Sequence, residues 1–131
     1  MELQQLKTFE DACKVLSLDA EKVIPDFSHF PERDQKAMIA HSKLVIIARA
    51  ANTIMGTDGK AWEPNWDDED EVKYFPWFGM DGGSSGFRCL VCVRWASGSL
   101  VGSRLCFPSW KVAQYIGETF LETYKAYFLY E

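Results

Sequence analysis

The sequence feature that constrains the fold most is one long helical pattern in the first half of the chain. It covers residues 32–54, after Pro31, which suits the start of a helix, and before the segment GTDG, whose glycines suit a helix end. In its second half the run LVIIARAA places apolar side chains in nearly every direction. Since a helix that is apolar all round is buried, we expect this helix at the centre of the fold.

Two further helices are expected near the ends of the chain. Thr8 and Asp11 have the spacing of a capping box, which indicates a helix start at residue 8. Ser109 is a good N-cap for a last helix over residues 109–128, in which apolar side chains recur every four residues: Val112, Ile116, Phe120 and Tyr124.

The middle of the chain has the pattern of β-strands. Residues 72–78 are rich in β-formers, although Pro76 restricts them to an edge or bulged strand. Residues 87–96 alternate, and the turn SGS leads into residues 100–107, so these two segments are expected to form a hairpin. The segment MDGGSSG between residues 80 and 86 is expected to be a flexible loop.

These elements predict an α+β fold with helices on one face of a small antiparallel sheet of about three strands. A chain of 131 residues fits a single domain over residues 1–131. We divide it into a helical part (1–55), a β-meander (72–107) and a C-terminal helix (109–128) that packs on one sheet face.

Charge and hydropathy disfavour several classes of partner. The formal charge of −5 does not suit a protein that binds nucleic acid through a basic surface. The longest apolar run is too short to span a bilayer, and the N-terminus lacks a secretory signal. We therefore expect a cytoplasmic protein of a bacterial host, with no membrane partner and with its four cysteines as free thiols.

Motifs for metals, cofactors and catalysis fail on spacing. Cys89 and Cys92 form a C-x-x-C on a strand, where residues three apart point to opposite faces, so buried structural thiols are favoured over a zinc or redox site. The acidic run 67–71 fails as a calcium loop because Val72 and Phe78 stand where glycine and glutamate are needed, which favours a solvated turn. We expect no cofactor and no metal, and the absence of a nucleophile–base motif favours binding over catalysis.

Arginines on the expected hairpin are the main candidates for a ligand site. Arg88 and Arg94 share the outer sheet face by parity, and Arg104 with Ser103 lies on the next strand. Such a cluster can hold a carboxylate or a phosphate bidentately. The alternative is that the arginines pair with the acidic run 67–71 and bind nothing.

Aromatic residues between positions 60 and 79 could stack beside these arginines. Tyr74 and Trp77 lie on opposite faces of their strand, so only one of them is expected to be exposed. Trp62 and Trp66 stand four apart around a proline, and they either fix the loop to the core or form the wall of a pocket.

Three motifs carry a resemblance to known proteins: WEPNWDDEDEVKYFPWF, VGSRLCF and the closing AQYIGETFLETYKAYF. With them, the chain resembles a family of small uncharacterised proteins encoded by phages and prophages of gut bacteria. The resemblance implies a virion part, a regulator, or an accessory factor that blocks a host protein or sequesters a nucleotide signal, and it brings no catalytic residue.

Two hypotheses follow. The first is a non-enzymatic phage or mobile-element accessory protein that binds a small anionic, nucleotide-like ligand or a host protein, and that would act against host defence. The second is a structural or protein-interaction component, either virion-associated or an oligomeric adaptor, in which exposed aromatic side chains form the interface.

Overall fold

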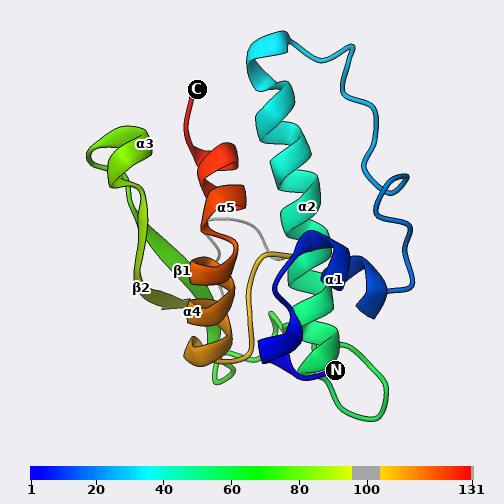
Figure 1. Cartoon of the computed structure of the whole chain (residues 1–131). Helices are drawn as coiled ribbons and strands as arrows, with labels where there is room; N and C mark the ends of the chain where they lie inside the picture. Colours follow the sequence, from blue (N-terminus) through cyan, green and yellow to red (C-terminus); the bar gives the residue numbers. More distant parts are fainter. Residues whose placement is uncertain (96–103, 131) are drawn as a thin grey trace.

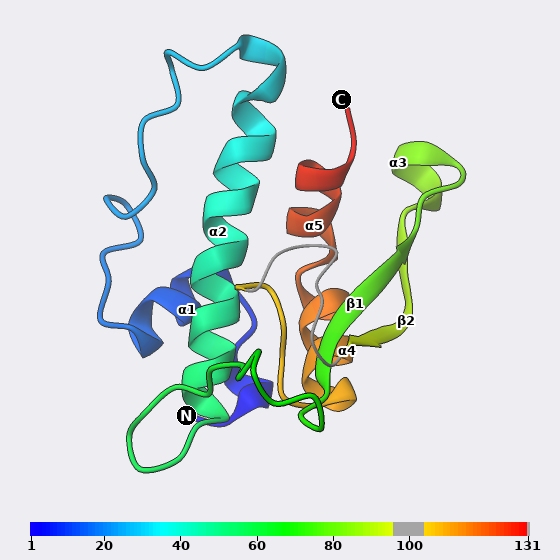
Figure 2. The same cartoon turned by 180° about the vertical axis from the view of Figure 1, so that it is seen from behind.

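The structure, a computed structural model, describes residues 1–95 and 104–130, with the backbone alone for residues 91–95. Figures 1 and 2 show a sheet, a middle layer of two helices, and a layer containing the longest helix. The elements in chain order are η1 (Leu3–Gln5), α1 (Phe9–Val15), α2 (Glu32–Ile54), β1 (Lys73–Gly79), α3 (Gly83–Gly86), β2 (Arg88–Trp95), α4 (Trp110–Thr119) and α5 (Leu121–Phe128). The fold is therefore α+β.

Helix α2 has the bounds that the sequence predicts. It packs against α1 on one side and α5 on the other (Figure 1). Its buried residues are Ala40, Leu44, Ile47, Ala48, Ala50, Ala51 and Asn52. The helix is buried along these positions but not all round, because Ile39 and Arg49 are exposed. The expectation of a fully enclosed helix is therefore wrong, and the open side of α2 is available to form a site.

The sheet is smaller than predicted. Strands β1 and β2 pair antiparallel, from Lys73 opposite Trp95 to Gly79 opposite Arg88. Phe107 does not extend a hairpin with β2; instead it exchanges two backbone hydrogen bonds with Tyr74 on β1, at 2.9 and 3.1 Å. The prediction of about three strands is wrong for the described residues, which form a two-stranded sheet with one added bridge. Residues 100–103 of the expected third strand lie outside the described residues.

Pro76 explains why β1 has little pairing on its second edge. Alternate residues of a strand direct their N–H groups to the same edge, so Pro76 lies on the edge where Tyr74 bonds Phe107. Proline has no N–H to donate there, and the described residues continue no ladder beyond Tyr74. Between Trp77 and Phe78 the register shifts by one residue, because Leu90 on β2 has no partner on β1. The prediction of an edge strand is therefore confirmed among the described residues, whereas the extra residue of the bulge is Leu90 on β2 and not a residue of β1.

Residues 80–86 join the two strands through a helical turn instead of an irregular loop. The turn is α3, and it follows Gly82, which has a left-handed φ of 85°. A left-handed φ is easily adopted by glycine and disfavoured for residues with a Cβ. The sequence predicted a flexible loop here, and the helical turn was not predicted.

The expected helix over residues 109–128 is divided into α4 and α5. Ser109 caps α4 as predicted, accepting a hydrogen bond from the Val112 N–H. The division is at Phe120, where the backbone leaves helical geometry (φ −106°, ψ 30°). The break lets α4 pack on β1 and β2 while α5 packs on α2. Tertiary packing therefore overrides a continuous helical pattern.

An aromatic cluster joins the sheet to α5. The Phe78 ring lies 5.0 Å from Phe87, 4.7 Å from Tyr124 and 5.3 Å from Phe128, measured between centroids. Phe78, Phe87 and Tyr124 are buried. The neighbouring Trp77 points to the opposite face and is 45% exposed, while Tyr74 is half-buried. The face of Trp77 is not open along its whole length, because Lys73 and Phe75, which share it by alternation, are buried as well.

Two of the three cysteines with described side chains have thiols that are harder to ionise than usual. Cys13 and Cys106 are buried, Cys89 is half-buried, and none of these three forms a disulfide. Burial raises the pKa of Cys106 from its ordinary 9.0 to about 11, and it also raises the pKa of Cys13. Both thiols therefore stay protonated at neutral pH, which agrees with a structural role.

The Cys106 thiol gives stability a dependence on alkaline pH. In the unfolded chain this thiol ionises near pH 9, whereas in the folded chain it keeps its proton until about pH 11. The unfolded state then binds fewer protons, so the free energy of unfolding should fall as pH rises through this window. Urea unfolding at pH 7.5 and pH 10 should show a smaller fall for Cys106→Ala than for the unsubstituted chain. Equal falls would contradict the assignment.

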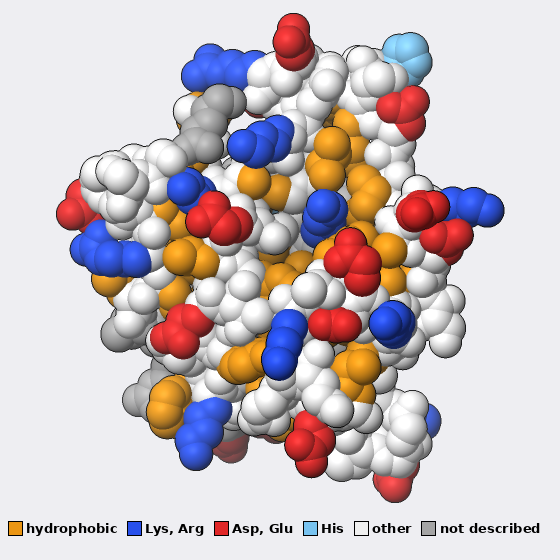
Figure 3. All heavy atoms as spheres, in the orientation of Figure 1, with side chains coloured by type: hydrophobic (Ala, Val, Ile, Leu, Met, Phe, Trp, Pro, Cys, Tyr) orange, Lys and Arg blue, Asp and Glu red, His pale blue; other side chains and the backbone are white. Residues whose placement is uncertain are grey.

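The surface carries charges of both signs. On the face drawn in Figure 3, acidic and basic side chains are interspersed with hydrophobic ones. Among the helices of the described ranges, none combines the length and apolar character needed to cross a bilayer.

Candidate functional site

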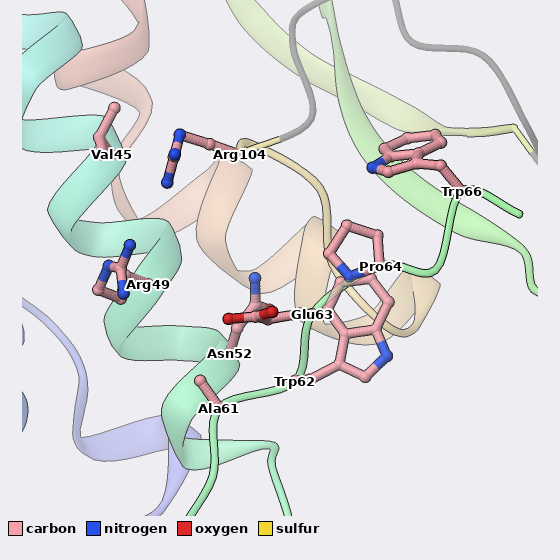
Figure 4. Close-up of a pocket in the computed structure, with 9 residues that line it drawn as sticks. All are labelled: Val45, Arg49, Asn52, Ala61, Trp62, Glu63, Pro64, Trp66 and Arg104. Atoms are coloured by element: carbon pink, nitrogen blue, oxygen red, sulfur yellow. The ribbon is translucent and has the colours of Figure 1, made fainter.

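A pocket of about 280 Å³ lies between α2, the segment after α2, and Arg104. Helix α2 contributes Val45, Arg49 and Asn52, which lie three or four residues apart and so share one side of the helix. The opposite wall is a loop, and the full lining is Val45, Arg49, Asn52, Ala61, Trp62, Glu63, Pro64, Trp66 and Arg104 (Figure 4). Its size is near the low end of the about 300–1,000 Å³ typical of small-molecule sites.

Two guanidinium groups lie at one end of this pocket. Figure 4 shows the Arg104 side chain extending toward α2 and the Arg49 side chain on α2 itself. Both residues are exposed. Across the described residues, no hydrogen bond or ion pair within 4.0 Å occupies either guanidinium. Two such cations form a natural site for a phosphate or a carboxylate.

The loop wall of the pocket is tied to α2 through Trp62. Its backbone N–H donates to the Asn52 carbonyl oxygen at 2.9 Å. Trp62, Pro64 and Trp66 are all half-buried, and Figure 4 shows both indole rings at the end of the pocket away from the arginines. The rings therefore offer stacking surface for a planar group.

A second set of contacts, the Lys73 network, fixes the position of Trp66. The Lys73 side chain is fully buried, and its ammonium donates to the backbone oxygens of Asn65 (2.6 Å) and Asp68 (3.1 Å). It also pairs with Glu71 at 3.4 Å and lies 5.1 Å from the Trp66 ring centroid. Burying an ammonium requires compensation of this kind, so the network fixes this loop firmly.

The acidic run is mostly a solvated turn, as predicted. Residues 67–70 are exposed, and the Asp70 N–H donates to the Asp68 carboxylate at 2.9 Å. Glu71 differs, because its carboxylate accepts from the Asn65 N–H at 2.7 Å in addition to its pairing with Lys73. One carboxylate of the run is thus structural. Within the described ranges, His, Cys, Asp and Glu side chains form no group of three that could hold a metal.

Asn52 brings an unsatisfied acceptor to the pocket floor. The side chain is 7% exposed, and its Nδ2 donates to the Cys106 carbonyl oxygen at 2.9 Å. The Oδ1 atom is buried and accepts no hydrogen bond from the described residues. A buried acceptor without a partner is unfavourable, typically by about 1–3 kcal/mol.

The predicted site residues are only partly brought together. Arg104, Trp62 and Trp66 line the pocket, but Arg88, Tyr74 and Trp77 do not. Arg88 lies opposite Gly79, at the end of the β1–β2 sheet away from Lys73. There its guanidinium forms an ion pair with Asp81 at 3.7 Å and donates to the Gly86 carbonyl oxygen at 2.8 Å. Its partner is therefore not the acidic run.

Two predicted site residues are not placed by the structure. Ser103 and the side chain of Arg94 lie outside the described residues. Arg94 is described by its backbone, which stands opposite Tyr74 on β1. The expected gathering of three arginines on the outer sheet face is not seen, since Arg88 and Arg104 are apart.

The sequence interpretation missed Arg49, Asn52 and Glu63. A signal for the first two was present, because Arg49 interrupts the apolar run of α2 and Asn52 follows three residues later on the same side. Because α2 was predicted to be buried all round, Arg49 and Asn52 were not considered as site residues. Glu63 lies between two aromatic residues of the loop, and no spacing rule marked it.

Comparisons with known proteins add no assignment: no family model, no curated protein and no solved structure matches this chain. The pocket is therefore interpreted from its own residues.

Proposed function

We propose that this chain is a binding protein for a small anionic ligand with a planar ring, of the nucleotide class. The observation that carries the proposal is the joining of two unpaired guanidinium groups and two indole rings in one pocket. Arg49 and Arg104 supply charge for a phosphate, while Trp62 and Trp66 supply stacking surface for a base. The pocket volume favours a single mononucleotide over a larger ligand.

The resemblance to phage and prophage proteins gives this proposal a setting. A phage-encoded protein that sequesters a nucleotide signal would act as an accessory factor against host defence. Binding alone is sufficient for such a role, so the proposal requires no catalytic group.

Substitution of the two pocket arginines tests the proposal. Calorimetric titration with AMP and GMP should detect binding to the unsubstituted chain. The double variant Arg49→Ala with Arg104→Ala should bind at least about tenfold more weakly, because two charge-assisted hydrogen-bond donors are lost.

The matched control is Arg88→Ala. It removes an exposed arginine at the far end of the sheet, so affinity should stay within about twofold of the unsubstituted chain. If the double variant and the control behave alike, or if neither nucleotide binds to the unsubstituted chain, the proposed pocket function is wrong.

A second candidate is a protein-interaction role through the outer sheet face. Trp77 and Leu90 are 45% and 41% exposed there, in neighbouring positions on β1 and β2. Exposed apolar side chains of this size suit an interface. Sedimentation measured over a range of concentrations separates the two candidates, since only this second one requires an assembly that is lost in Trp77→Ala.

A further inference from the structure

The polar groups of the pocket follow an order from one end to the other. In Figure 4, Arg49 and Arg104 lie at one end, Glu63 and Asn52 lie in the middle, and the rings of Trp62 and Trp66 lie at the other end. A nucleotide has the matching order of phosphate, sugar and base. We propose that Glu63 and Asn52 recognise the ribose hydroxyls, so that the ligand is a ribonucleotide and not a deoxyribonucleotide. This inference rests on the proposed function.

Glu63 is otherwise out of place in a pocket for an anion. A carboxylate repels a phosphate, so it belongs beside a part of the ligand that is neutral and donates hydrogen bonds. The 2′- and 3′-hydroxyls of ribose are two adjacent donors, and an ionised carboxylate offers two acceptor oxygens. A carboxylate that accepts from a ribose hydroxyl is also the usual arrangement in dinucleotide-binding folds.

Asn52 adds a second acceptor whose orientation is fixed. Its Nδ2 is occupied by the Cys106 carbonyl oxygen, so the amide cannot turn over without placing two oxygens together. Oδ1 is thereby left as an acceptor without a partner among the described residues. A ligand hydroxyl that donates to Oδ1 satisfies this atom, which gives a gain that a ligand without the hydroxyl lacks.

The Oδ1 atom is covered in the ligand-free chain, so a side chain of the loop wall must shift for a ligand to reach it. Trp62 lies in that wall, and its backbone N–H donates a hydrogen bond to the Asn52 carbonyl oxygen. Binding should therefore change the Trp62 fluorescence. Because Trp62→Phe removes this chromophore, comparison with that variant assigns the signal.

The test compares ribonucleotides with their 2′-deoxy forms by calorimetric titration. For the unsubstituted chain, dAMP and dGMP should bind at least about tenfold more weakly than AMP and GMP. In Glu63→Gln the difference should shrink to less than about threefold, because the carboxylate acceptor is gone. Glu69→Gln, an exposed glutamate of the same loop outside the pocket, should keep the full difference.

The outcomes separate the two proposals. Equal binding of ribose and deoxyribose forms to the unsubstituted chain overturns the ribose inference and leaves the nucleotide pocket standing. A full difference that survives in Glu63→Gln overturns the role of Glu63. No binding of any of the four nucleotides overturns the proposed function and this inference with it.

Discussion

Replacement of Lys73 by methionine should lower the free energy of unfolding by about 3 kcal/mol. The substitution keeps an unbranched side chain in a fully buried position but removes the ammonium. The backbone oxygens of Asn65 and Asp68 then lose a donor, and Glu71 loses its cation. Because the remaining Glu71 carboxylate is 28% exposed and can regain water, we place the effect toward the low end of losses from broken buried pairs.

The matched control is Lys125→Met. Lys125 pairs with Glu122 at 3.7 Å, but the Glu122 side chain is 84% exposed, so this change should alter stability by less than about 1 kcal/mol. Urea unfolding monitored by far-UV circular dichroism measures both variants. If the two lysines have equal effects, Lys73 does not stabilise the loop as proposed.

The same substitution should weaken ligand binding, since Lys73 positions the Trp66 ring. We expect AMP affinity to fall by about tenfold in Lys73→Met, within the range reported for loss of one base-stacking group. The titration should be performed at a temperature at which the Lys73→Met variant is folded. Unchanged AMP affinity in the folded variant would mean that the Lys73 network does not contribute to ligand binding.

Replacement of Phe78 by alanine should be the most damaging single change in the sheet, with a loss of about 3–5 kcal/mol. Phe78 is 6% exposed, and its ring contacts Phe87, Tyr124 and Phe128. Truncation leaves a cavity between the sheet and α5 and removes three aromatic contacts.

The neighbouring residue is an internal control for this prediction. Trp77 points to the other face and is 45% exposed, so Trp77→Ala should change stability by less than about 1 kcal/mol. Thermal and urea unfolding measure both. A larger loss for Trp77→Ala than for Phe78→Ala would mean that the strand faces are reversed or that Trp77 is covered by a partner.

The helices that the sequence predicts best are those with clear end signals. Pro31 and Gly56 enclose α2, and both bounds agree with the structure because those residues act locally. The capping box of Thr8 and Asp11 is likewise present, with both hydrogen bonds formed. Local chemistry decides such positions, so one sequence is sufficient to find them.

Elements that depend on distant contacts were predicted less well. The break at Phe120 has no glycine or proline to mark it, and it follows from the need of α4 and α5 to face different neighbours. The pairing of Phe107 with Tyr74 joins residues 33 positions apart, which strand alternation alone cannot specify. Alternation assigns a face to each residue but not a partner strand.

The candidate site shows the same division. Trp62 and Trp66 were recognised as a pair with two alternative roles, and the structure gives Trp66 both of them, as pocket wall and as a contact of buried Lys73. Arg49 and Asn52 were hidden in a helix that was taken to be wholly buried. A pocket formed by a helix and a remote loop depends on the tertiary fold, so their convergence was not readable from spacing.

The most direct test of the nucleotide pocket is native mass spectrometry of the protein purified from cells under mild conditions. We predict that the unsubstituted chain and Arg88→Ala carry an added mass that tandem dissociation identifies as a ribonucleotide. The double variant Arg49→Ala with Arg104→Ala should have lost it. The same added mass on all three proteins, or none on the unsubstituted chain even after incubation with AMP and GMP, would contradict the account.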